Sequence, residues 1–194
     1  MDSLTDIVCE MAAVPAGPEE YHEEGSVLQH TVKVIEEIQT LRPSDPDAFL
    51  IAFFHDVGKL RTPDDHLPNH YDHDELGAEL IAELPESILP ADSRQKAKIV
   101  AEQHMRFKKL PKMKPVKTIR LVEDLVDAGV APTAMVDLIE ADAKGREPQR
   151  SIDREQFKQC IDRVFKAEAH VEDKTVSNDQ HRMQLMIEYY QEQG

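Results

Sequence analysis

The chain is poor in the residues that build disulfide scaffolds, aromatic surfaces and membrane spans. It has no tryptophan, two cysteines, and only 5% aromatic residues in 194 positions. Two cysteines cannot form the dense cross-links of small secreted domains, and they favour a reducing compartment. No apolar run approaches the roughly 20 residues that cross a bilayer. The acidic N-terminus also lacks the basic and apolar regions of a signal peptide. We therefore expect a cytoplasmic protein that does not cross a membrane.

Basic residues are also in deficit. The chain carries 23 Lys and Arg against 38 Asp and Glu, a formal net charge of −15. This balance argues against a general nucleic-acid coat and against a membrane-surface binder. A local basic site remains compatible with it.

Helical periodicity runs through nearly the whole sequence. In residues 26–41, Val27, His30, Val34 and Ile38 fall on one helical face behind the N-cap candidate Ser26. A buried helix is predicted at about 47–57, with Gly58 closing it in a left-handed conformation. No alternating strand pattern of useful length occurs. The sequence predicts an all-α helical bundle, divided into an acidic leader that is partly disordered (1–20), a core (21–150) and a C-terminal helical extension (151–194).

Polar side chains interrupt the apolar faces of four predicted helices. They are His30, the pair His55 and Asp56, His104, and Asp142. Any one of them is most simply a hydrogen-bonded core residue. Four such positions on separate helices instead indicate a metal held between facing helices. A donor set of His and Asp without thiolate favours Mn²⁺, Fe²⁺, Co²⁺, Ni²⁺ or Mg²⁺ over structural Zn²⁺.

This ordered set resembles the HD-domain metal-dependent phosphohydrolases, which are named for the adjacent His-Asp pair in a motif such as "HDVGK". The resemblance implies that a first metal is bound by His30, His55, Asp56 and Asp142. It also implies that His73 and His104, which match additional histidines of some members, hold a second metal or position the substrate phosphate. Asp56, Lys59, His73 and His104 are the catalytic candidates.

A closer resemblance is to the HD domain of bacterial CCA-adding tRNA nucleotidyltransferases. It extends from Tyr21 to Arg146 and rests on the blocks "YHEEGSVLQHT", "FFHDVGKLRTP", "LPNHYDHDELGAEL", "VAEQHMRF" and "LIEADAKGR". Only about 20 residues precede the first block, and they contain no glycine-rich nucleotide motif. CCA addition is therefore not expected. The resemblance implies phosphatase and 2′,3′-cyclic phosphodiesterase chemistry.

Several cations and histidines are candidates for substrate binding. Lys59 and Arg146 suit the charged oxygens of a phosphoryl group, but each is equally well explained as a helix C-terminal cation favoured by the helix dipole. His22 and His70 fall in predicted loops, where they either line the pocket or lie exposed without a role.

Residues 105–120 form the most basic part of the chain. They contain seven Lys or Arg and no acidic residue, and begin directly after His104. With Arg106, Lys108 and Lys109 nearest the proposed metal, the segment would attract a phosphate-rich ligand. The alternative is a solvated turn that relieves repulsion in an acidic protein. Adjacency to the site favours the first interpretation.

These features predict a metal-dependent hydrolase of a phosphomonoester or phosphodiester on a nucleotide or RNA end, with a 2′,3′-cyclic or terminal phosphate as the best specific candidate. Two alternatives stay open: a hydrolase of small nucleotides (a nucleoside monophosphate, a cyclic nucleotide or an alarmone) and a non-catalytic sensor of metal or nucleotide. The C-terminal helices either pack on the core, cover the site or pair two copies in a homodimer.

Overall fold

The computed structural model describes residues 3–172 and 176–193. These residues form nine α-helices and three short 3₁₀-helices, and the only strand-like pairing among them is an isolated bridge between Pro15 and Ser26. The predicted all-α fold is confirmed. No helix in the described part of the chain has the length and apolar character that a membrane crossing requires.

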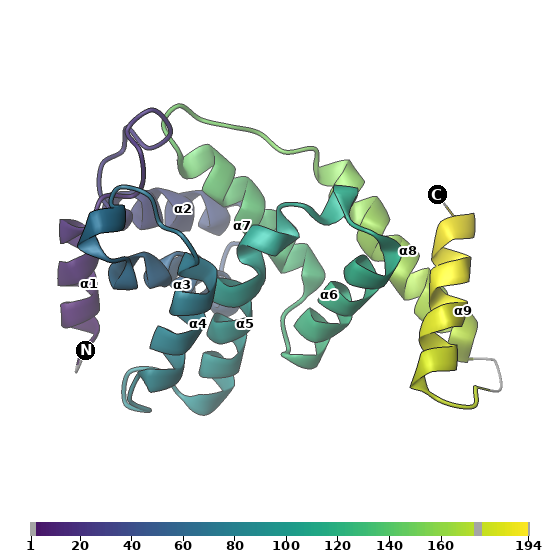
Figure 1. Ribbon diagram of the computed structural model, residues 1–194. Coiled ribbons are helices and arrows are strands. Elements are labelled where there is room, and N and C mark those ends of the chain that lie inside the picture. The colour runs from purple at the N-terminus through teal and green to yellow at the C-terminus, as the bar shows by residue number, and fades with distance from the viewer. Residues whose placement is uncertain (1–2, 173–175, 194) are drawn as a thin grey trace.

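The α-helices are α1 (Leu4–Ala13), α2 (Val27–Leu41), α3 (Pro46–Phe54), α4 (His73–Glu83), α5 (Ala91–Phe107), α6 (Pro115–Asp127), α7 (Pro132–Gly145), α8 (Arg154–Glu172) and α9 (Asp179–Glu192). The 3₁₀-helices are η1 (Val57–Arg61), η2 (Asp64–His66) and η3 (Leu110–Lys112). Longer loops join α1 to α2 and α7 to α8 (Figure 1).

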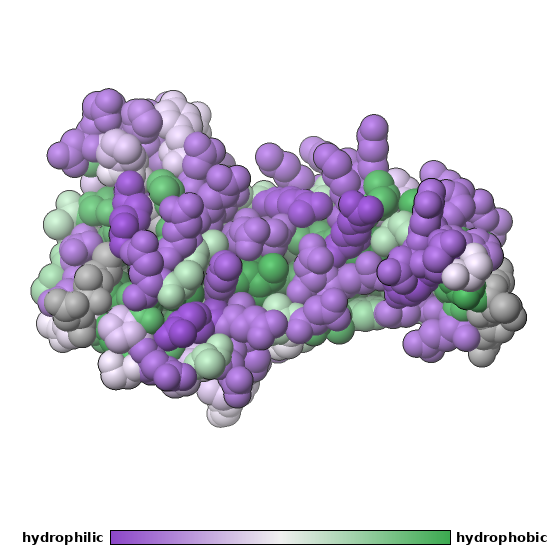
Figure 2. Space-filling view, turned by 60° about the horizontal axis from the view of Figure 1, so that its bottom comes forward, coloured by the Kyte–Doolittle hydropathy of each residue, from purple (hydrophilic) through white to green (hydrophobic). Residues whose placement is uncertain are grey.

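Two apolar clusters form the core. The larger one joins α2, α3 and α5 to α6–α9, whereas the smaller one joins α1, η1 and α4 to α2, α3 and α5. Hydrophilic side chains cover most of the face shown in Figure 2, with apolar ones in small patches between them. Helices α2, α3 and α5 belong to both clusters, and two of the predicted metal ligands, His30 and His104, lie on α2 and α5.

The acidic leader is more ordered than expected. Residues Leu4–Ala13 form α1, whose Ser3 and Asp6 make a reciprocal capping box. Ile7 and Met11, one helical turn apart, are both fully buried in the smaller cluster. The charged residues of the leader hid this apolar stripe, and its burial supplies the stabilisation that a short isolated helix lacks.

The buried third helix ends earlier than its apolar pattern indicates. Helix α3 stops at Phe54, and Val57–Arg61 turn more tightly as η1. The expectation for Gly58 is wrong, since Gly25 and Gly129 are the glycines of the described chain with positive φ. Gly58 instead packs its backbone against α4: a Cβ added there would lie 1.9 Å from the His73 carbonyl oxygen and 2.4 Å from the Gly77 nitrogen. This contact requires glycine and sets η1 directly beside His73.

The C-terminal helices lie at the end of the molecule remote from α1 (Figure 1). Val164 on α8 and Met186 on α9 are fully buried in the larger cluster, and Tyr190 is nearly so. Helix α9 contacts α6 and α8 rather than the helices that carry the predicted metal ligands. It therefore does not cover the predicted site.

Candidate metal centre

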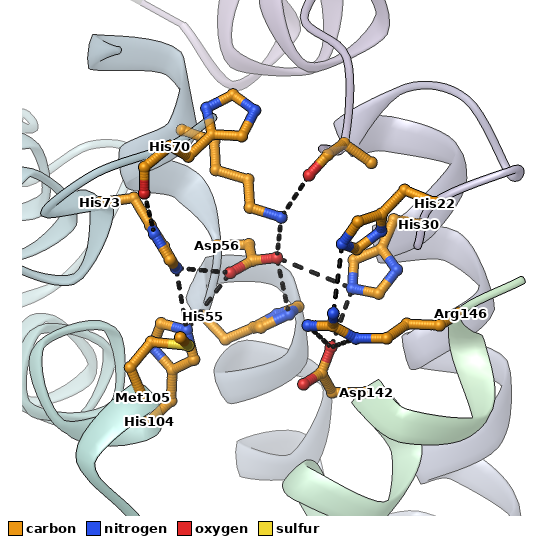
Figure 3. A network of polar contacts seen from close by, with 12 residues as sticks. His22, His30, His55, Asp56, His70, His73, His104, Met105, Asp142 and Arg146 are labelled. Atoms are coloured by element: carbon orange, nitrogen blue, oxygen red, sulfur yellow. Dashed lines mark hydrogen bonds and ion pairs between the residues drawn. The ribbon is translucent and has the colours of Figure 1, made fainter. Parts of the chain in front are cut away.

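The predicted ligands converge at the junction of five helices (Figure 3). His30 comes from α2, His73 from the first residue of α4, His104 from the last turn of α5 and Asp142 from the last turn of α7, whereas His55 and Asp56 lie between α3 and η1. All six are buried. The early end of α3 turns Asp56 away from the helix axis and into the junction.

Asp56 lies at the centre of this group. Its Oδ1 is 3.3 Å from Nε2 of both His73 and His104. Its Oδ2 is 3.4 Å from His55 Nε2 and 3.7 Å from His30 Nε2. One carboxylate thus faces two sets of imidazoles, one on each oxygen, and each set with Asp56 is compact enough to hold a metal ion.

Three of the histidines are held by the backbone in the same way. His55 Nδ1 donates to the Ala52 carbonyl at 2.7 Å, His73 Nδ1 to the His70 carbonyl at 2.8 Å, and His104 Nδ1 to the Ala101 carbonyl at 2.7 Å. A carbonyl oxygen only accepts, so each Nδ1 carries a proton. Each ring therefore turns Nε2 toward Asp56, in the arrangement typical of metal-ligating histidine.

These Nε2 atoms together favour a bound cation. Nε2 of His73 and Nε2 of His104 lie 3.3 Å apart, and both face a carboxylate oxygen. Burial lowers the pKa of His104 to about 4, so its ring is neutral near pH 7 and Nε2 cannot donate. His55 Nε2 makes no hydrogen bond to any described residue. A divalent cation in either set would coordinate its Nε2 atoms together with an Asp56 oxygen, so the residues present fit such an ion.

Asp142 adds a carboxylate to the candidate metal set that contains His30, His55 and Asp56. His30 Nε2 lies 3.1 Å from Asp142 Oδ1. Burial lowers the pKa of His30, but its contacts with Asp142 and Glu24 raise that pKa more, so the net shift is upward. For Asp142, burial raises the carboxyl pKa, but Lys108 and His30 outweigh it, so that the pKa lies well below its usual value. Asp142 is thus an ionised ligand candidate.

Three cations point into the same junction. Lys59 Nζ lies 2.7 Å from Asp56 Oδ2 and donates to the Ala16 carbonyl at 2.6 Å. Lys108 Nζ lies 2.6 Å from Asp142 Oδ2, and the Arg146 guanidinium is 3.3 Å from Asp142 Oδ1. Lys59 lies in the last turn of η1 and is only 4% exposed, so its charge is buried against Asp56.

The other substrate-binding candidates differ in how close they lie to the cluster. His22 is buried, with Nε2 3.3 Å from the Arg146 guanidinium, and burial lowers its pKa to about 4. His70 contacts Thr62 Oγ1 at 2.7 Å and donates from Nε2 to the Pro15 carbonyl at 2.8 Å, which fixes its loop. Lys109 is exposed at the edge of the junction. The structure does not bring Arg106 to the cluster: it donates to Gln103 Oε1 at 3.2 Å, because α5 continues through Phe107 and turns Arg106 away from His104.

The family model for the HD domain matches residues 27–162. The chain belongs to the HD-domain family. HD-domain proteins of this type are metal-dependent phosphohydrolases, and the His and Asp cluster of this chain is of a kind that could hold a divalent metal.

A multifunctional CCA protein from Cupriavidus metallidurans is 34% identical to this chain over 137 residues. The aligned region covers 69% of the chain but 32% of that relative. The chain thus matches about a third of the relative's length. No solved structure gives a significant match. The sequence resemblance to the HD domain of CCA-adding enzymes is confirmed.

Glu24, just before the start of the HD-domain match, also reaches the cluster, and sequence reasoning missed it. Its buried carboxylate lies 2.9 Å from His30 Nδ1 and 2.5 Å from His22 Nδ1, and its second oxygen accepts from the Glu147 amide at 3.0 Å. Burial raises the pKa of Glu24, but these hydrogen bonds lower it to about 2. Glu24 lies in an acidic stretch before the α2 cap, and only its spacing from His22 and His30 sets it apart. His30 is thus the one clustered ligand candidate whose Nδ1 faces a carboxylate instead of a carbonyl.

Glu24→Gln is expected to weaken metal binding about 10-fold to 100-fold, because a carboxylate behind a ligating imidazole raises its basicity and an amide does not. Titration calorimetry with Mn²⁺ on chelator-stripped protein measures the change. Glu23→Gln, one residue away and exposed, removes the same charge and serves as the control. Equal affinity in both variants would show that Glu24 only holds the loop.

Proposed function

We propose that this HD domain hydrolyses a 2′,3′-cyclic or terminal phosphate on a nucleotide or an RNA end. The observation that carries the proposal is the convergence of four imidazole Nε2 atoms on Asp56, beside the three cations Lys59, Lys108 and Arg146. Imidazole nitrogen and carboxylate oxygen ligands next to fixed positive charges suit a metal-bound phosphoryl group in transfer.

Each side chain then has a role. His30, His55, Asp56 and Asp142 would hold one ion, and Asp56, His73 and His104 a second. A divalent ion there, of which Mn²⁺, Ni²⁺, Co²⁺, Fe²⁺ and Mg²⁺ are the candidates, lowers the pKa of a bound water and offsets phosphoryl charge. Asp56 orients the attacking water, whereas Lys59 and Arg146 bind the equatorial phosphoryl oxygens.

A cavity of about 220 Å³ opens over this cluster. Asp56, Lys59, His73, His22 and Arg146 line its inner part. Its size suits a phosphate group with part of a sugar, so the reacting ester would be bound here. The same small size favours a second candidate, hydrolysis of a small nucleotide such as a nucleoside monophosphate.

The test is hydrolysis by chelator-stripped protein with each metal added back. Substrates are 2′,3′-cyclic AMP, an aryl phosphodiester, an aryl phosphomonoester and a nucleoside monophosphate. We expect turnover that returns with metal and is highest for 2′,3′-cyclic AMP. Preference for the nucleoside monophosphate would select the second candidate. Absence of turnover in protein that demonstrably binds the ion would contradict both and favour a sensor.

A further inference from the structure

A second and larger cavity, of about 530 Å³, adjoins the first. Met105 and Arg146 line both cavities, and Asp142 lines the larger one, so the larger cavity begins at the candidate metal ligands. It extends between the end of α5 with η3 on one side and the start of α8 on the other. We call it the basic groove, after Lys108, Lys109, Lys112, Arg146 and Arg150 in its wall.

The charges of the basic groove are unusual in a chain of net charge −15. Lys108 and Arg146 are balanced by Asp142. Lys109, Lys112 and Arg150 form no ion pair with any described carboxylate, and all three are exposed. The groove's other acid, Asp153, accepts from the backbone amides of Glu155 and Gln156 at the start of α8. Lys109 and Lys112 thus line the groove without a counterion, and Arg150, whose guanidinium lies over the Tyr21 ring at 5.0 Å from its centroid, adds a third positive charge.

The rest of the lining is apolar. Ile139, Ile152 and Phe157 line the groove, and Phe157 stacks on Phe107 with ring centroids 5.7 Å apart. A lining of basic and apolar side chains suits an oligonucleotide. Its phosphates can pair with Lys and Arg, and its sugars and bases can pack on the apolar residues. A nucleoside monophosphate or a cyclic mononucleotide has no second phosphate to place near Lys109, Lys112 and Arg150.

We propose that the basic groove binds the nucleotides next to the reacting phosphate, which makes an RNA oligonucleotide, rather than a mononucleotide, the substrate class. This inference rests on the proposed function, which places the reacting ester in the 220 Å³ cavity. Residues 150–157, beyond the last residue of the resemblance at Arg146, then contribute to substrate choice through Arg150, Ile152 and Phe157.

The test compares a tetranucleotide ending in a 2′,3′-cyclic phosphate with 2′,3′-cyclic AMP. In the variant Lys109→Ala/Lys112→Ala/Arg150→Ala, kcat/KM for the tetranucleotide should fall about tenfold or more through KM. The value for 2′,3′-cyclic AMP should fall much less, because its only phosphate occupies the 220 Å³ cavity. The slope of log KM against log salt should decrease by about 2, since each phosphate contact on a single strand contributes roughly 0.7. Lys98→Ala/Lys158→Ala/Lys166→Ala removes the same charge from exposed positions outside the groove and should leave both substrates unaffected.

Binding separates this inference from the proposed function. Fluorescence anisotropy of a labelled tetranucleotide with a 3′-phosphate measures the affinity of the oligonucleotide for the protein, whether or not turnover occurs. If the groove variant binds the tetranucleotide more weakly and the control variant does not, the basic groove is its binding site, even if the tested esters are not cleaved. Equal binding by wild type and groove variant, or equal kcat/KM of the wild type for both substrates, would overturn it.

Discussion

Asp56→Ala is expected to abolish metal binding and phosphohydrolase activity together. Asp56 belongs to both candidate metal sets, since Oδ1 faces His73 and His104 while Oδ2 faces His55 and His30. Its loss removes a ligand from each set and the group that orients the attacking water. We expect turnover to fall at least about a thousandfold, equivalent to roughly 4 kcal/mol of transition-state stabilisation.

The same substitution has a separate effect on stability. In the metal-free protein Asp56 is the counterion of the buried Lys59, with 2.7 Å between Nζ and Oδ2. Burial raises the Asp56 pKa, but Lys59 and His55 outweigh it and hold that pKa well below its usual value. Leaving Lys59 buried without this partner should cost about 3–5 kcal/mol of unfolding free energy. Asp56→Ala/Lys59→Met should recover most of this stability but none of the metal binding.

Urea denaturation and titration calorimetry measure the two effects separately. The control is Asp64→Ala in η2, which is exposed and should change neither quantity by more than about 0.5 kcal/mol. Metal affinity retained by the Asp56→Ala/Lys59→Met double variant would contradict the central position of Asp56. If Asp56→Ala loses activity but binds metal as the wild type does, the role of Asp56 is to orient the attacking water and not to bind metal.

Apolar periodicity predicted the cluster because it identifies which positions of a helix are buried, and polar residues at such positions stand out in the sequence. His30, His104 and Asp142 occupy positions where a core residue is expected, and a buried polar group requires a partner. The sequence therefore indicated which residues converge, though the roles of these residues remain a prediction. Glu24 gave no such signal, since it precedes α2 and its burial results from the loop closing onto Glu147.

Local geometry explains where sequence reasoning went wrong. Arg106 and Lys108 are two residues apart in a basic run, and the charge pattern does not separate them. The end of α5 does: the chain leaves the helix after Phe107, so Lys108 reaches Asp142 while Arg106 stays on the side of Gln103. Similarly, Gly58 was taken for a helix terminator because glycine commonly serves that purpose. Its actual role depends on a tertiary contact with α4 that no local pattern shows.

Gly58→Ala is expected to destabilise the protein and to disturb the candidate metal site from outside it. The added Cβ would lie 1.9 Å from the His73 carbonyl oxygen and 2.7 Å from the Gly77 Cα, and both are backbone atoms that cannot rotate away. Helix α4 must therefore move off η1. We expect a loss of about 3 kcal/mol or more in unfolding free energy, at the upper end for overpacked sites.

The displacement would also carry His73 away from Asp56, because His73 is the first residue of α4 and its Nε2 lies 3.3 Å from Asp56 Oδ1. His30, His55 and Asp142 do not depend on this contact. Metal titration of the folded variant should thus show weakening of the set with His73 and His104, and retention of the set with His30. Glu79→Ala, exposed on the same helix, is the matched control. Wild-type stability in Gly58→Ala would mean that α4 and η1 can separate without cost, and His73 would then not be held in place by this contact.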